Sequence, residues 1–243
     1  MSDGRYHARI VHRDKGQFDV VCRYLVDASG RNSSIAKQLG ASITQHDRLT
    51  GVGAFFKSSS ASLEQLQIIE SDSCGWWYSA SLSKHLLVVS FFSDFELISN
   101  MKLNRKTAWQ NYLNKTHHMA NRIEGLESIE NNLWIRPAGT HFNHFSRISN
   151  YLPVGDAACS FDPISSMGLG FAMASGCQAA AIIGNAKTPN MFIKSAHQYQ
   201  NDLKNQFQHY LTLKEQFYNK EQRWQDASFW QKRHKQLDSP IFQ

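Results

Sequence analysis

One stretch of the chain decides the fold: residues 153–176 read PVGDAACSFDPISSMGLGFAMASG. A short apolar strand ends at Gly155, and Asp156 follows immediately. After a turn that contains Pro163, a helix opens on Gly168-Leu169-Gly170. Small residues at a helix start let a flat molecule pack against the backbone, and the exposed amides there stabilise negative charge. This order predicts a ligand site; the alternative is a tightly packed helix pair with Asp156 as a surface cap.

A second block, residues 24–33, reads YLVDASGRNS. An apolar strand delivers Asp27, Gly30 and Arg31 at its carboxyl end, where α/β sheets bind ligands. The Arg31 guanidinium can bind a phosphate through two hydrogen bonds, and the helix that follows adds amide donors. The alternative is an ordinary loop in which Asp27 caps Ser29 or Gly30.

These two blocks, in this order, resemble the FAD-dependent aromatic-hydroxylase-like flavoproteins, which include flavin-dependent halogenases and geranylgeranyl reductases. The resemblance implies FAD as cofactor, with Asp27, Gly30 and Arg31 beside it. It also implies that Gly155 and Asp156 belong to the second FAD motif, with Asp156 bonding the ribityl chain. Pro163 then lies in the loop over the isoalloxazine ring, and the amides of Gly168, Leu169 and Gly170 approach the pyrimidine edge of the ring.

The sequence DPISSMG at residues 162–168 is most similar to flavoproteins that modify amine-oxidase precursors during quinone-cofactor biogenesis. That subtype implies a polypeptide substrate, with a tryptophan of a protein precursor as the modified group. Halogenases carry a Trp-x-Trp-x-Ile-Pro stretch, whereas the nearest segment here, residues 74–81, reads CGWWYSAS and lacks Ile-Pro. Halogenation is therefore the less favoured alternative.

Family members begin with a βαβ unit bearing Gly-x-Gly-x-x-Gly, which binds the ADP half of FAD, and no such sequence occurs in these 243 residues. We therefore expect an α/β (α+β) fold: an incomplete FAD-binding domain, an inserted antiparallel β-sheet substrate domain and a C-terminal helical tail. The expected boundaries are 1–50 and 141–186 for the FAD-binding domain, 51–140 for the sheet and 187–243 for the helical region. A complementing N-terminal polypeptide is an implied partner.

Strand and helix patterns fill in this outline. We expect a hairpin from strands at 8–12 and 18–26, with the second strand buried on both faces because it is apolar nearly throughout. Further strands are expected at 52–56, 67–70, 75–82, 85–92, 132–136 and 151–154, and helices at 35–40, 105–115, 168–184 and about 190–236. In strand 75–82, Trp76 and Tyr78 face one side and Trp77 the other. The resemblance makes these three aromatic residues candidates for the substrate cavity, and ordinary sheet core is the alternative for each.

Composition narrows the function further. The net charge of +6 is mild, no apolar run is long enough to span a bilayer, and the basic, aromatic tail gives weak support for nucleic-acid binding. We expect neither a membrane span nor a nucleic-acid partner. The four cysteines form no C-x-x-C pair and the eleven histidines form no metal-binding spacing, so we expect a cytoplasmic protein without a metal.

The sequence thus predicts a flavin-dependent oxidoreductase of the monooxygenase type that acts on an aromatic group and in which reduced flavin activates O2. No side chain is assigned as catalytic acid or base. One alternative is a truncated or split flavoprotein portion without independent activity, and a weaker one is a basic helical binding module on a β scaffold.

Overall fold

The computed structural model describes residues 4–59, 62–129 and 132–234. The chain divides into two compact units, each built from two separate segments. Unit 1 comprises Met1–His46 and Thr140–Leu211, and unit 2 comprises Asp47–Gly139 and Thr212–Gln243. The described part of the chain contains no helix that is both long and apolar enough to cross a membrane.

The described part of unit 1 contains three small sheets, and two long helices hold most of its helical residues. Its strands are β1 (Tyr6–His12), β2 (Gly16–Cys22), β3 (Leu25–Asp27), β4 (Ser42–Gln45), β11 (His141–His144), β12 (Tyr151–Pro153) and β13 (Cys159–Ser160). They pair as β1-β2, β13-β11-β4 and the parallel pair β12-β3. Short 3-10 turns are η1 (Gly30–Asn32), η2 (Gly155–Ala157) and η3 (Pro163–Ser165), and the helices are α1 (Ser34–Gln38), α5 (Gly168–Asn185) and the first part of α6 (Pro189–Tyr218).

Helix α6 contributes the aromatic core of unit 1 because its apolar residues recur at helical intervals. The buried side chains on this face are Phe192, Tyr199, Leu203, Phe207 and Tyr210. Phe207 contacts the rings of Phe142 and Phe161, which come from β11 and from the segment after β13. The segments of residues 140–161 are thereby fixed against the helix.

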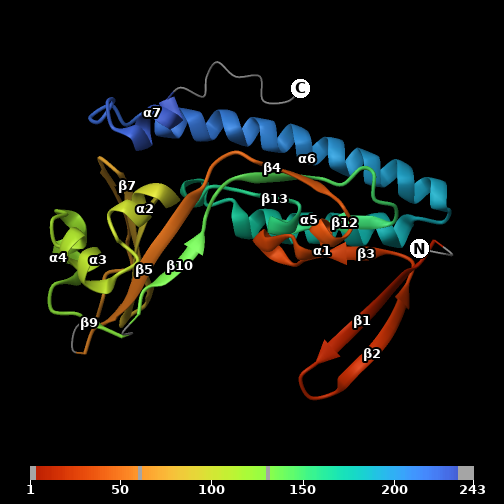
Figure 1. Cartoon of the computed structure of the whole chain (residues 1–243), viewed down its shortest axis with the longest axis horizontal. Helices are drawn as coiled ribbons and strands as arrows, with labels where there is room; N and C mark the ends of the chain where they lie inside the picture. Colours follow the sequence, from red (N-terminus) through yellow and green to blue (C-terminus); the bar gives the residue numbers. More distant parts are fainter. Residues whose placement is uncertain (1–3, 60–61, 130–131, 235–243) are drawn as a thin grey trace. The chain divides into compact units, whose positions relative to one another are not determined.

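The β1–β2 hairpin confirms the expected pairing but corrects the expected burial. Its strands pair over their full lengths, yet Ile10, Phe18 and Val21 are exposed, and β2 is not buried on both faces. The expected strand 18–26 is also interrupted, since β2 ends at Cys22 and β3 starts at Leu25. In Figure 1 the hairpin extends away from β3 and α1. An apolar pattern alone does not say what covers a strand, and here no described residue covers this one.

Unit 2 is an antiparallel sheet with helices. Its strands are β5 (Leu49–Lys57), β6 (Gln67–Asp72), β7 (Gly75–Ser83), β8 (Leu86–Asp94), β9 (Glu127–Ser128) and β10 (Trp134–Pro137). The order is β10-β5-β8-β7-β6, with β9 also pairing with β5. The helices are α2 (Phe95–Asn100), α3 (Lys106–Leu113), α4 (His118–Ile123) and α7 (Ser228–His234), together with the end of α6. Figure 1 shows α2, α3 and α4 close to this sheet.

One face of the sheet in unit 2 packs on helix α3. Trp77, Phe91 and Trp109 are fully buried there and belong to one apolar cluster with Val52 and Leu113. The expected helix at 190–236 is interrupted, because α6 ends at Tyr218 and α7 starts at Ser228. The expected α/β class with an antiparallel sheet and a C-terminal helix is confirmed. The domain boundaries expected from the sequence stay a prediction.

Candidate functional site

The parallel pair β3–β12 brings the two sequence blocks together in unit 1. Pro153 lies opposite Asp27, and the Val154 amide donates to the Asp27 carbonyl at 2.9 Å. Because the strands are parallel, their carboxyl ends meet at one edge of the sheet. The turns that contain Arg31 and Asp156 therefore start side by side, although they lie far apart in the sequence.

The Asp27 side chain stabilises the turn that follows β3. One carboxylate oxygen accepts the Ser29 amide at 2.8 Å, and the other accepts the Ala36 amide at 3.1 Å and the Tyr151 hydroxyl at 2.7 Å. The side chain is fully buried, so these donors satisfy a carboxylate that would otherwise be costly to bury. The capping role considered as the alternative for Asp27 is present, and this residue shapes the loop that carries Gly30 and Arg31.

Arg31 and Asp156 form a partly exposed ion pair. The Arg31 Nη2 atom lies 3.3 Å from Asp156 Oδ2, and the two side chains are 23% and 31% exposed. Arg31 Nη1 also donates to the Ser160 hydroxyl at 3.1 Å. The guanidinium thus ties the first block to the second and orients the Asp156 carboxylate, which remains accessible to a ligand.

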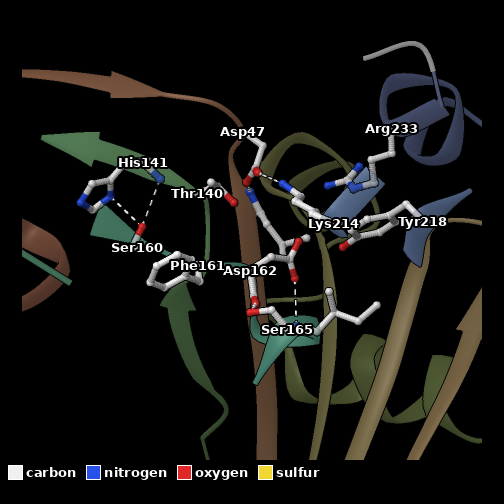
Figure 2. Close-up of polar contacts among 12 residues, drawn as sticks. Asp47, Thr140, His141, Ser160, Phe161, Asp162, Ser165, Lys214, Tyr218 and Arg233 are labelled. Atoms are coloured by element: carbon white, nitrogen blue, oxygen red, sulfur yellow. Dashed lines mark hydrogen bonds and ion pairs between the residues drawn. The ribbon is translucent and has the colours of Figure 1, made fainter. Parts of the chain in front are cut away.

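His141 supports this pair from β11. Its Nε2 atom lies 3.0 Å from the Asp156 carbonyl oxygen, and its Nδ1 atom lies 2.8 Å from Ser160 Oγ, as Figure 2 shows for the latter contact. A carbonyl only accepts, so Nε2 carries the proton and Nδ1 accepts the Ser160 hydroxyl hydrogen. Burial, with a further contribution from the positive charge of Arg31, lowers the pKa of His141 and keeps it neutral. The sequence analysis did not foresee this link between His141 and the site.

Gly155 sets the approach of helix α5 to the second block. Its φ is +54°, and a Cβ atom there would lie 3.2 Å from the Ala172 Cβ. The Gly155 amide donates to Ser175 Oγ at 2.9 Å. Glycine is therefore required both by its backbone conformation and by the close packing of α5.

The loop that precedes α5 is rigidly held. Asp162 is buried and accepts the Ile164 amide at 3.1 Å, its carbonyl accepts the Ser165 hydroxyl at 2.8 Å, and its own amide donates to Tyr210 at 2.7 Å. Figure 2 shows Ser165 beside Asp162. Pro163 fits this turn because it occupies the first position of η3, where no amide donor is needed.

The N-terminus of α5 is open. Its N-cap residue, Met167, makes no side-chain capping bond, and Cβ atoms added at Gly168 or Gly170 would meet nothing within 4 Å. Leu169 and Met173 are 76% and 67% exposed. The first amides of this 18-residue helix thus have no side-chain acceptor among the described residues, and they suit a ligand atom with partial negative charge.

Unit 2 holds the aromatic candidates. Trp76 stacks on Phe92 and donates its indole N–H to Tyr218 Oη at 3.0 Å, whereas Trp77 packs against Trp109 on the other face. The two faces predicted for this strand are therefore correct. A role of Trp76, Trp77 and Tyr78 in a substrate cavity stays a prediction, and both tryptophans are sheet core in unit 2.

Unit 2 also contains buried charges that the sequence pattern did not reveal. The Lys214 ammonium is almost fully buried and pairs with Asp47, as Figure 2 shows. Burial raises the pKa of Asp47, but the opposing charge and hydrogen bond of Lys214 outweigh it, so the net shift of the pKa is downward. A lysine in an amphipathic helix normally faces solvent, so the sequence gives no sign of this pair. No group of three or more His, Cys, Asp or Glu among the described residues is arranged to hold a metal ion.

Comparisons with known proteins reveal similar sequences and folds. No family model matches the chain. A protein of Marinomonas mediterranea named "Putative FAD-dependent oxidoreductase LodB" is 40% identical over 234 residues, which is 96% of this chain and 62% of that protein. The chain thus spans less than two thirds of that relative.

Solved structures show the same fold. The flavin-dependent halogenase CmlS matches with a TM-score of 0.80 at 21% identity, covering 96% of this chain and 43% of that chain. The peptidyl tryptophan dihydroxylase QhpG, described as essential for tryptophylquinone cofactor biogenesis, matches with a TM-score of 0.65 at 18% identity, covering 95% and 52%. The resemblance drawn from the two sequence blocks is confirmed. The chain is a homologue of the protein named "Putative FAD-dependent oxidoreductase LodB", and it has the fold of about half of a flavin-dependent halogenase and of a peptidyl tryptophan dihydroxylase.

Proposed function

We propose that this chain contributes the ribityl and isoalloxazine half of an FAD site in a flavin-dependent oxidoreductase of the monooxygenase type. The observation that carries the proposal is the pairing of β3 with β12, which places Arg31 and Asp156 together beside the uncapped helix α5. Bound FAD would supply oxygen activation, the chemistry that no protein side chain provides.

The chain's own residues have distinct parts in this proposal. Asp156 accepts hydrogen bonds from ribityl hydroxyls, and Arg31 holds its carboxylate in position. The amides of Gly168, Leu169 and Gly170 donate to the electron-rich edge of the ring, where the helix dipole favours negative charge. Gly155 and the Pro163 turn keep α5 close enough for both contacts.

The proposed substrate is an aromatic group, and a tryptophan of a protein precursor is the specific candidate. The tryptophan dihydroxylase among the structural neighbours, whose name specifies a peptidyl substrate, supports this choice. A halogenase function has no additional support from the described residues, because segment 74–81 lacks the Ile-Pro of halogenases. The proposed compartment is the cytoplasm, which suits four cysteines that are all free thiols.

We also propose that additional polypeptide, in the same or another chain, completes the ADP half of the site. The pair β3–β12 has only two strands of three residues, whereas parallel strands are normally buried within larger sheets. Val26 on β3 and Leu169 and Met173 on α5 are exposed, as are Ile10, Phe18 and Val21 on the β1–β2 hairpin. A βαβ segment that adds a strand beside β3 would cover such surfaces.

Flavin titration tests the proposal. If the chain holds only the ribityl and ring half of FAD, riboflavin and FAD should bind with similar affinity in a fluorescence-quenching titration. ADP should not compete with either flavin. Addition of a polypeptide with a Gly-x-Gly-x-x-Gly βαβ unit should then strengthen FAD alone and make ADP a competitor.

The variant Asp156→Asn should weaken riboflavin binding about tenfold, the effect of losing one charge-assisted hydrogen bond. The matched control Asp19→Asn breaks an exposed ion pair on the hairpin and should leave binding unchanged. Absence of flavin binding with and without the βαβ polypeptide would refute the proposal.

A further inference from the structure

The strand β6 leaves one edge of the sheet in unit 2 unpaired. It is the last strand of the sheet order and pairs with β7 along residues Gln67–Asp72. No other strand among the described residues pairs with it. Such an edge presents backbone N–H and C=O groups that can pair with an added strand.

The two faces of β6 are flanked by different segments. The Glu70 carboxylate accepts the amides of His117 and Met119, at 2.8 and 3.0 Å, on one face. The next side chain, Ser71, points to the opposite face and contacts Glu221 and Arg223, both at 2.5 Å. The edge of β6 therefore lies between the segment at 115–118 and the segment at 221–224.

A cleft of about 540 Å³ is lined by residues Ile69 to Asp72 together with both flanking segments. Because β7 occupies the other side of β6, a cleft that touches both flanks must follow the unpaired edge of the strand. Ile69, half exposed at 54%, provides an apolar contact beside it. The cleft is thus shaped for an extended chain rather than for a compact ligand.

The charges of the cleft favour an acidic occupant. The Glu70 carboxylate is already bonded to backbone amides, and the Asp72 carboxylate accepts the Cys74 amide and the Tyr112 hydroxyl. The neighbouring Glu221 carboxylate is bonded to Arg223. Lys115 lines the cleft, and its side-chain ammonium has no hydrogen-bond or ion-pair partner among the described residues. The carboxylates at the cleft are therefore bonded within the chain, whereas the Lys115 ammonium is available to an acidic side chain.

We propose that an extended, acidic segment of a partner polypeptide binds as an additional strand along the edge of β6. Backbone pairing supplies affinity, and an acidic side chain near Lys115 supplies specificity and register. This inference extends the proposed function to substrate recognition. It rests on the proposed function for one point, that the partner is a polypeptide substrate. It places recognition of that polypeptide on unit 2.

Fluorescence anisotropy with a labelled synthetic peptide tests the inference. The probe has about eight residues of alternating Val and Thr with two Asp substitutions, and it should bind the full chain. Replacing its Asp by Lys should weaken binding roughly three- to tenfold, and N-methylation of alternate amides should abolish it, because N-methyl groups remove the backbone donors. Equal binding of all three peptides would overturn the inference.

Variants of the chain locate the site. Lys115→Glu should weaken binding of the acidic peptide roughly three- to tenfold, whereas Lys84→Glu, on the β7–β8 turn outside the cleft, should not. A dimer in sedimentation analysis that Lys115→Glu dissociates would show instead that a second copy pairs with this edge, and would overturn the inference. Riboflavin affinity should be the same in both variants. Peptide binding without flavin binding would refute the proposed function alone, and the reverse result would refute this inference alone.

Discussion

The substitution Ser160→Ala tests whether the contacts around Asp156 are energetically coupled. Ser160 Oγ bonds to three groups: the His141 ring at 2.8 Å, the His141 amide at 3.2 Å and Arg31 at 3.1 Å. Arg31 is partly exposed and can turn toward water, but both groups of His141 are buried and would be left unpaired. Two such groups at about 1–3 kcal/mol each predict a loss of about 2–6 kcal/mol in the free energy of unfolding of unit 1.

Urea unfolding followed by circular dichroism measures this loss. With a slope of about 2 kcal/mol/M, the midpoint should fall by about 1–3 M. Ser33→Ala is the matched control, since Ser33 is a fully buried serine of the same unit whose hydroxyl has no hydrogen-bond partner among the described residues. Its change should stay within about 0.5 kcal/mol. If the two variants lose the same stability, the assigned role of Ser160 is wrong.

Two further predictions concern the same unit. The folded-state pKa of His141 lies below its unfolded value, so the unfolded chain binds more protons and unit 1 should lose stability as the pH falls through about 6.5 toward the folded pKa. Urea titrations at several pH values measure this dependence, and in His141→Gln the free energy of unfolding should change less with pH. An unchanged pH dependence would contradict the neutral, buried imidazole. Gly155→Ala should destabilise by at least roughly 1 kcal/mol more than Gly40→Ala, because both have positive φ but only the Gly155 position is crowded by α5. Equal melting shifts for the two glycine variants would contradict the close packing at Gly155.

The sequence predicted the features that depend on local order along the chain. The strand before Gly155, the helix that opens at Gly168 and the hairpin at the amino end follow from apolar period and turn residues. The family pattern placed both blocks beside one cofactor, but it did not predict the ion pair between Arg31 and Asp156.

Features that depend on long-range pairing could not be predicted in this way. His141 reaches Ser160 only because β11 pairs with β13, and no spacing in the sequence encodes that pairing. Asp27 looked available to a cofactor, yet the hydroxyl of Tyr151 and two amides occupy its carboxylate. The exposed face of β2 was mistaken for core because hydrophobicity reports a preference for burial and does not identify the covering partner.

The parallel pairing of β3 with β12 has a consequence for the order of folding. The two strands close a loop of more than one hundred residues, which contains the whole sheet of unit 2. Closing so long a loop costs about 2 kcal/mol more than closing a ten-residue hairpin, while β7 and β8 meet through a short turn. Contacts of short sequence separation form fastest, so the antiparallel sheet forms early and shortens the effective loop. The pair that brings Arg31 to Asp156 is then expected to close after that sheet, and a ligand that binds only the closed pair would stabilise the folded state.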